Sequence, residues 1–285
     1  MIVVSLLERQ SRHKQRFTNA RNTVQARSRI LLPSLQAYLA CAFCGVIFFI
    51  GFLLPIGQLL LWAIPHLSSG LTDQFWRYML GSLSLSLLAM TIITAFALLL
   101  AFAARTQNSY LANWSVKIST LGYALPGTVL AVGLLAPIAA IDHYLARLGF
   151  AAPILQGSIV VMLLAYSVRF MAVAFSPIEN NLLRVTPSID AASRSLSVSG
   201  LSMLWRVHFP MIRVGVLTAM VLVFVDVMKE LPITLMTRPF GFNTLAVRIY
   251  ELSSEGLWQR AALPALAIVL VGLIPVVILI LRADK

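Results

Sequence analysis

The sequence predicts an all-α membrane protein that crosses the bilayer about six times. Hydrophobic residues make up 59% of the 285 residues and charged residues only 11%, whereas about a quarter of a soluble domain is charged. The apolar residues gather into runs longer than the roughly 20 residues that a spanning helix needs. No segments of alternating polarity typical of barrel strands occur, so we expect the spans to be helices.

The first 36 residues have a composition of their own. A short apolar stretch at residues 2–7 is followed by a basic tract. A secretory signal peptide has the reverse order, with positive charge first, and a stretch this short cannot span a bilayer. We interpret residues 1–36 as a basic cytoplasmic tail that begins with the remnant of a preceding span. Residues 37–285 are the predicted membrane domain.

Six spans are predicted in that domain. They lie at about residues 37–64, 78–104, 118–141, 154–175, 214–236 and 261–281. Pro126 and Gly127 fall inside the third span, where we expect a kink with close helix packing or, as an alternative, a gate hinge. Arg169 lies near the far end of the fourth span, and we expect it to snorkel to the cytoplasmic edge, with a role in substrate contact as the alternative.

The orientation follows from the basic residues. Residues 1–36, 105–117, 179–213 and the C-terminus together hold 15 Lys and Arg, and the opposite loops hold five. The positive-inside rule then places both termini and the 179–213 loop in the cytoplasm of a multi-pass inner-membrane protein. This distribution also accounts for the net charge of +12 without a nucleic-acid partner.

The longest cytoplasmic loop runs from Glu179 to Arg213 and is amphipathic. Its sequence predicts a short helix, a turn at Gly200 and a second helix that leads to Pro210. Loops of this length are usually functional. On physical grounds alone, a helix lying on the membrane surface explains the pattern equally well.

This loop resembles the cytoplasmic loop of ABC-importer permeases, whose pattern is E-A-A, three residues, G, nine residues, I-x-L-P. Counting back from Pro210 places Ser197 at the glycine and Ala191 at the glutamate, with Asp190 one residue earlier. The resemblance implies the ABC importer permease fold, with a loop at about 179–210 that docks on a separate ATP-binding subunit and transmits its closure. The candidate coupling residues are Asp190, Ala191, Ala192, Arg194, Ser197, Gly200, Val207, Phe209 and Pro210.

Four further segments are similar to ferric-iron importer permeases. They are Phe224–Pro232, Arg238–Ala246, Tyr123–Leu130 and Ser254–Trp258. The similarity covers about residues 37–280 and matches the second half of those double-length permeases. It implies ferric iron as cargo, an extracytoplasmic substrate-binding protein, and a second permease half or a second copy as partner. Thiamine, sulfate and polyamine remain alternative cargoes. A further alternative is that the chain is an inactive fragment of a permease.

Three charged residues fall inside the fifth predicted span. Asp226, Lys229 and Glu230 are spaced i, i+3 and i+4, so they share one helical face on which Lys229 can pair with Asp226. Because such a charge at a span centre costs about 2.5–3.5 kcal/mol, that face is expected to point into the bundle. We predict that it lines or gates a pathway together with Pro232, Pro126 and Gly127. A structural ion pair near the outer interface is the alternative.

The sequence predicts no enzyme. It contains no Gly-x-x-x-x-Gly-Lys-Ser/Thr loop, so ATP is expected on the partner subunit and no cofactor on this chain. The four histidines show no metal-ligand spacing, and no nucleophile and base pair suggests catalysis. An ion-coupled secondary transporter that uses Asp226, Lys229 and Glu230 as a relay is the alternative from a different class.

Overall fold

The computed structural model describes residues 33–107, 109–150 and 153–283. The predicted basic tail therefore lies almost wholly outside the described residues. The chain forms two compact units, Met1–Leu53 and Leu54–Lys285. In the first unit, the described residues form helix α2 (Ser34–Phe48) and the π-helical turn η1 (Phe49–Leu53).

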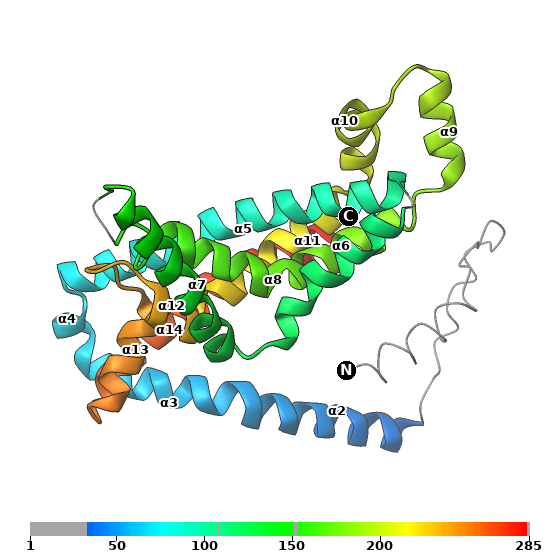
Figure 1. The fold of residues 1–285 in the computed structure, drawn as a ribbon. Helices are drawn as coiled ribbons and strands as arrows, with labels where there is room; N and C mark the ends of the chain where they lie inside the picture. The colour runs from blue at the N-terminus through cyan, green and yellow to red at the C-terminus, as the bar shows by residue number, and fades with distance from the viewer. Residues whose placement is uncertain (1–32, 108, 151–152, 284–285) are drawn as a thin grey trace. The chain divides into compact units, whose positions relative to one another are not determined.

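The second unit contains the remaining helices (Figure 1). The long ones are α5 (Asp73–Gln107), α7 (Gly127–Arg147), α8 (Ile159–Leu182), α11 (Phe209–Met228) and α14 (Trp258–Ala283). The shorter ones are α3 (Leu54–Ala63), α4 (Leu67–Gly70), α6 (Tyr110–Leu121), α9 (Pro187–Ser195), α10 (Gly200–Met203), α12 (Pro232–Thr237) and α13 (Leu245–Ser254).

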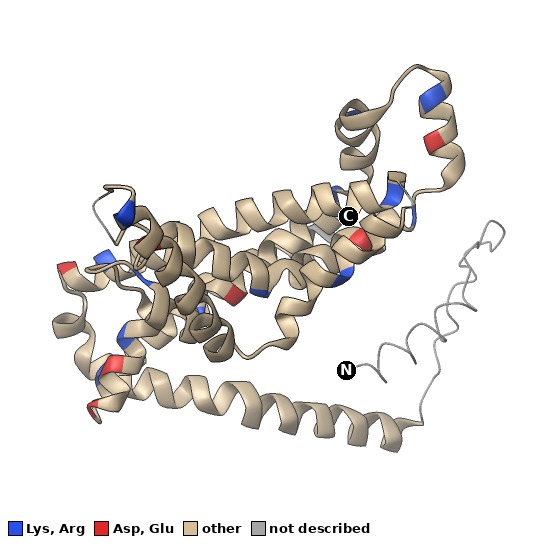
Figure 2. Ribbon diagram, viewed as in Figure 1, with Lys and Arg blue, Asp and Glu red and all other residues tan. Residues whose placement is uncertain are grey.

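The predicted fold class is confirmed. Six helical segments of the described residues are long and apolar enough to cross a membrane: Ser34–Gly70, Asp73–Gln107, Gly127–Arg147, Ile159–Leu182, Gly200–Met228 and Trp258–Leu281. Figure 2 shows long stretches of the helices without charged residues, and between Arg77 and Arg105 the helix α5 carries none. The chain is therefore a multi-pass membrane protein.

Helices α5, α8 and α11 pack side by side at the centre of the second unit (Figure 1). Their contact surfaces are rich in fully buried alanine, including Ala89 and Ala97 on α5, Ala165 on α8 and Ala219 on α11. Small side chains let helix backbones approach closely, which is how helices associate in lipid without a hydrophobic driving force. This packed trio is the frame that positions the candidate sites.

Side-chain caps fix several helix starts. Ser109, Ser158 and Thr244 accept hydrogen bonds from the backbone N–H groups three residues later, which satisfies donors that the helix itself leaves free. The buried carboxylate of Asp142 on α7 accepts hydrogen bonds from the backbone N–H groups of residues 154–156. The connection to α8 is therefore tied back onto α7.

Two of the predicted spans are discontinuous, which corrects the prediction of a single helix in each. The predicted span at residues 118–141 is divided between two helices. Helix α6 ends at Leu121, a 3-10 turn covers Gly122–Ala124, and α7 begins at Gly127. The predicted span at residues 214–236 is likewise divided, because α11 ends at Met228 and α12 begins at Pro232. Irregular backbone at membrane depth is tolerated only where protein buries it or water reaches it. The two breaks are therefore candidates for function.

Candidate functional site

The two helix breaks meet at an ion pair between Arg169 and Glu230. Nε of Arg169 on α8 lies 3.5 Å from Oε2 of Glu230, which follows the end of α11. Nη1 of the same guanidinium donates to the carbonyl of Leu125 in the other break at 2.7 Å. One side chain on a continuous helix thus contacts both irregular segments. We call Gly122–Gly127, Arg169 and Glu230 the helix-break site.

The second break is also held by hydroxyl groups. Thr234 on α12 donates to the carbonyl of Glu230 at 2.6 Å. Because that bond uses the threonine proton, the fully buried Tyr166 of α8 donates its own proton to Thr234, at 2.5 Å. Glu230 Oε1 in turn accepts from the backbone N–H of Ile233 at 3.2 Å, which caps the start of α12.

Arg169 is not a snorkelling residue at the membrane edge. It is the eleventh of the 24 residues of α8, so it lies roughly 15 Å from the start and roughly 20 Å from the end of a helix that rises 1.5 Å per residue. Its side chain is only 22% exposed. The earlier assignment failed because the predicted span at 154–175 began and ended too early, which placed the arginine near the end of the span.

The three charges of the fifth span separate in the structure. Lys229 pairs with Asp226 at 3.0 Å, as predicted, but the lysine side chain is 63% exposed. Glu230 faces away from that pair toward Arg169, because α11 ends at Met228 and the backbone turns there. The prediction that all three share one helical face is therefore wrong.

The predicted glycine and prolines lie at the break boundaries. A Cβ atom on Gly127 would stand 3.0 Å from Oε1 of Glu230 and 3.4 Å from the guanidinium of Arg169. Pro126 precedes α7, and Pro232 occupies the first turn of α12, where its missing N–H has no helical partner to lose. The structure thus brings Gly127 and Glu230 together, and leaves Asp226 and Lys229 outside this contact.

The 179–213 loop forms the predicted helix, turn and helix. Helix α9 ends at Ser195, and the chain passes through two residues with positive φ, Ser197 at 60° and Gly200 at 57°. The N–H of Val198 donates to the carbonyl of Ser193, and the N–H of Ser197 donates to that of Arg194. These bonds define a Schellman motif, whose left-handed position usually holds glycine. In this chain that position is Ser197, the residue aligned with the glycine of the permease pattern.

Ser197→Gly is expected to stabilise the protein by several tenths to about 1 kcal/mol, because a side chain in the left-handed region costs about 1–2 kcal/mol and glycine's extra freedom when unfolded offsets part of the gain. The melting temperature of the purified chain measures this. Ser195→Gly, inside the last turn of α9, is the matched control and is expected to destabilise. Equal melting temperatures for the two variants would contradict the assignment of Ser197 to the left-handed position of the Schellman motif.

Asp190 anchors α9 to two long helices. Its Oδ2 accepts from Nε and Nη2 of Arg105 at 3.1 and 2.9 Å, and its Oδ1 contacts Nε2 of His208 at 2.8 Å. Burial raises the pKa of Asp190, but the hydrogen bond from His208 and the charge of Arg105 outweigh it and lower the pKa below its usual value. The carboxylate is therefore ionised at neutral pH.

The opposite side of this loop is exposed. Ala191, Ala192 and Arg194 lie on the outer face of α9. Three large apolar side chains beside them face solvent, with Leu196 78%, Leu201 60% and Trp205 56% exposed. Exposed apolar side chains in a segment outside the membrane-spanning helices are candidates for contact with a partner. Val207 and Phe209 are partly buried, and Pro210 is the second residue of α11.

Sequence analysis missed Arg105, Arg169 and His208. Arg105 had been assigned only as the basic end of a span, and its partner Asp190 lies 85 residues away. His208 is completely buried, although a histidine flanked by Val207 and Phe209 in a cytoplasmic loop gives little sign of that. The one usable signal was an arginine within the fourth span.

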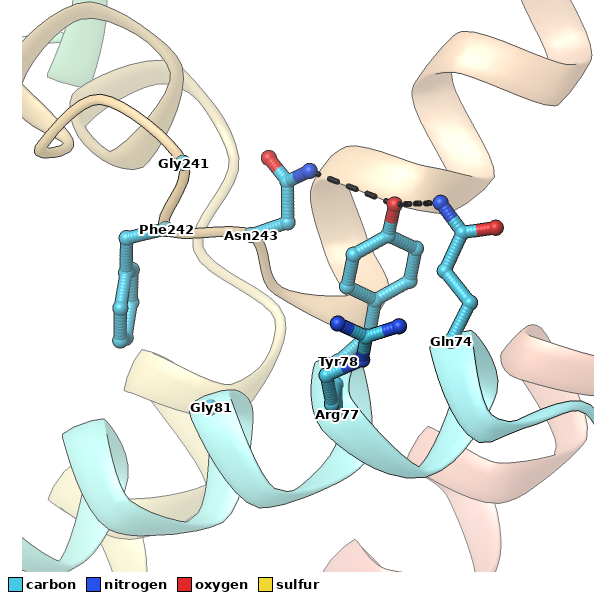
Figure 3. A pocket seen from close by; sticks show the side chains of 7 residues that line it. All are labelled: Gln74, Arg77, Tyr78, Gly81, Gly241, Phe242 and Asn243. Atoms are coloured by element: carbon cyan, nitrogen blue, oxygen red, sulfur yellow. Dashed lines mark hydrogen bonds between the residues drawn. The ribbon is translucent and has the colours of Figure 1, made fainter.

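A cavity of about 340 Å³ lies at the first turns of α5, at the opposite end of that helix from Arg105. Figure 3 shows the phenol of Tyr78 between two amides: it is hydrogen-bonded to Gln74 at 2.6 Å and to Asn243 at 3.4 Å. Arg77, Gly81, Gly241 and Phe242 complete the lining. Arg105 follows Arg77 by 28 residues of one helix (105 − 77), or roughly 42 Å. The cavity and the 179–213 loop are therefore separated by about a membrane thickness.

Comparison with known proteins confirms the predicted resemblance, although no family model matches the sequence. The chain is 28% identical over 244 residues to the Fe(3+)-transport system permease protein FbpB 2 of Haemophilus influenzae, covering 85% of this chain and 46% of that protein. It is 26% identical over 245 residues to the putative 2-aminoethylphosphonate transport system permease protein PhnV of Salmonella typhimurium, covering 80% of this chain and 87% of the relative. The chain thus spans about half the length of the iron-transport relative.

Solved structures share the fold. A bacterial alginate ABC transporter, crystallised with a periplasmic protein that binds an alginate pentasaccharide, contains a chain that superposes with a TM-score of 0.68 at 16% identity. The match covers 86% of this chain and 92% of that one. A second structure of an alginate-importing ABC transporter gives a TM-score of 0.69 at 14% identity. The helical arrangement is that of ABC-importer permeases.

Proposed function

Since this chain has the fold of ABC-importer permeases and its sequence relatives are transport permeases, we propose that it is the membrane-spanning subunit of an ATP-driven importer. ATP hydrolysis takes place on a separate subunit, and an extracytoplasmic binding protein delivers the substrate. The complex lies in the inner membrane, with both termini in the cytoplasm. The permease path is completed by a second permease half or a second copy of this chain.

The observation that carries this proposal is the 179–213 loop. It presents a short helix and three exposed apolar side chains, Leu196, Leu201 and Trp205, on the side that the basic residues assign to the cytoplasm. A soluble partner with an apolar cleft would bury this surface. A membrane-surface helix would instead need a polar face on the opposite side of α9, and that side holds the buried Asp190 cluster.

Gentle solubilisation of the tagged chain is expected to recover an ATP-binding subunit with it. The same experiment with residues 190–204 scrambled is expected to lose that subunit, because helix α9 and the positions of Leu196 and Leu201 are lost. Recovery is measured by mass spectrometry and by ATPase activity of the eluate. Residues 67–72, which comprise α4 and its link to α5, serve as a scrambled control at the other membrane face. An ATPase that is retained by the scrambled 190–204 loop, or absent with the native loop, contradicts the proposal.

The cargo we propose is ferric iron. The support is the similarity to the Haemophilus iron-transport permease, together with the matching segments around residues 123–130, 224–232 and 238–246. The Salmonella relative keeps 2-aminoethylphosphonate among the alternatives, beside thiamine, sulfate and polyamine. Uptake of radiolabelled iron in the presence of each competitor distinguishes these cargoes.

An ion-coupled secondary transporter is the second candidate, favoured by the charges at mid-membrane in the helix-break site. In that case uptake would follow the proton gradient and continue after ATP depletion. Importer activity instead stops when ATP is depleted. Measuring uptake under an ionophore and under ATP depletion separates the two mechanisms.

A further inference from the structure

The carboxylate of Asp190 faces the membrane helices and is turned away from the exposed face of α9. Its side chain is 14% exposed, and both of its oxygens are engaged, one by Arg105 and the other by His208. A carboxylate held in this way has little capacity left for a partner subunit. The contact with that subunit must therefore come from the exposed side of the loop.

Arg105 joins three segments through one guanidinium. Besides Asp190, it donates to the carbonyl of Leu182 at 2.7 Å and to that of Val185 at 2.9 Å. Leu182 is the last residue of α8, where its carbonyl also accepts from the N–H of Val185 at 3.1 Å, and a cation at a helix C-terminus is favourable. The end of α5, the end of α8 and the start of α9 are thus fastened at one point.

His208 adds the fourth segment. It is completely buried just before α11, with Nε2 on Asp190 and its ring against Phe102 of α5 at a centroid distance of 5.5 Å. Its Nδ1 is buried and has no hydrogen-bond partner among the residues that the structure describes. A buried polar ring that leaves one nitrogen unpaired is unfavourable, which indicates that the contact with Asp190 holds it in place.

We propose that Asp190, Arg105 and His208 form a positioning cluster that makes α9 move as one body with the cytoplasmic ends of α5, α8 and α11. This inference rests on the proposed importer function and assigns Asp190 a role within the chain in place of a contact with the ATPase. Force applied to the exposed face of α9 then reaches three packed membrane helices directly, through charge-assisted hydrogen bonds that resist stretching.

Carboxylate labelling of the wild-type protein tests the first part. A water-soluble carbodiimide with an amine probe is expected to leave Asp190 unlabelled both with the ATPase bound and after it has been stripped away. Asp73, an exposed carboxylate at the start of α5, is the labelled control. Labelling of Asp190 that appears only after the ATPase is removed would identify a docking contact and overturn the proposal.

Asp190→Asn tests the second part. We expect the variant to retain the ATPase in the pull-down while substrate transported per ATP hydrolysed falls about tenfold, a size typical of mutations in coupled networks. Arg105→Gln is expected to give the same phenotype, and the double variant no further loss, because both act on one cluster. Asp73→Asn is the same chemical change at the opposite end of α5, and it is expected to keep the wild-type ratio of substrate transported to ATP hydrolysed.

The outcomes separate the two proposals. If the wild-type chain retains no ATPase, the importer function itself fails. If the wild type retains it but Asp190→Asn loses it, Asp190 is a docking residue and the cluster proposal fails. A wild-type ratio of transport to hydrolysis in Asp190→Asn also overturns it. Should the variants not fold, the labelling of wild-type Asp190 still decides.

Discussion

Glu230→Gln is expected to reduce uptake at least tenfold while the amount of protein in the membrane stays unchanged. The substitution keeps the size of the side chain and the oxygen that accepts from the N–H of Ile233. What it removes is the negative charge 3.5 Å from Arg169. Leaving one partner of a largely buried ion pair uncompensated costs about 3–5 kcal/mol. The two helix breaks would then lose the charge that draws them together.

Uptake by cells and immunoblots of isolated membranes measure these two quantities. Glu255→Gln is the matched control, since Glu255 is exposed and lies beyond the end of α13. A second variant, Glu230→Gln with Arg169→Gln, should recover part of the loss, because a neutral pair at a buried site is better tolerated than a single charge. Wild-type uptake in the single variant would show that the ion pair has no part in transport.

Gly122→Ala is expected to destabilise the fold by about 3 kcal/mol or more. A Cβ atom at this position would lie 2.0 Å from the backbone carbonyl oxygen of Val168 and 2.8 Å from its Cγ1 atom. The obstacle is backbone, so no side-chain rotation relieves it, and the break after α6 would have to move away from α8. Overpacking of close-packed sites commonly costs about 1–3 kcal/mol, and a backbone clash lies at or above the upper end.

Thermal unfolding of the purified chain in detergent measures this loss. Gly133→Ala is the matched control, because Gly133 lies inside α7 and, among the described residues beyond the backbone of its own turn, no atom stands within 4 Å of its ideal Cβ position. There the same substitution should raise stability by up to about 1 kcal/mol, since alanine favours helix. Equal melting temperatures for the two alanine variants would mean that α6 and α8 do not approach as closely as described.

Patterns that act locally could be predicted from the sequence. The six apolar runs, the helix and turn of the 179–213 loop, and the Asp226–Lys229 pair all depend on residues close together along the chain. Ser197 is the sharpest case. Counting along the motif placed it at a glycine, and the structure gives it the positive φ that glycine favours.

Long-range pairings could not be predicted. Arg105 and Asp190 are 85 residues apart, and nothing in a single sequence says that they meet. Arg169 was misplaced because hydropathy locates a span only to within several residues, and the fourth span ends at Leu182, well beyond the predicted Phe175. A kink was predicted at Pro126 and Gly127, but the division of each span into two separate helices was not, because an interrupted span still has continuous apolar composition. The functional roles of the site residues stay predictions.

The pairing of Arg169 with Glu230 also constrains how the chain enters the membrane during synthesis. Glu230 follows Arg169 by 61 residues (230 − 169), so at ~5–20 residues per second the arginine waits about 3–12 s for its carboxylate. During that interval the apolar side chains of α8 must offset the roughly 2.5–3.5 kcal/mol that an arginine at the centre of a span costs on insertion. The whole of α8 is thus synthesised before its counter-ion exists.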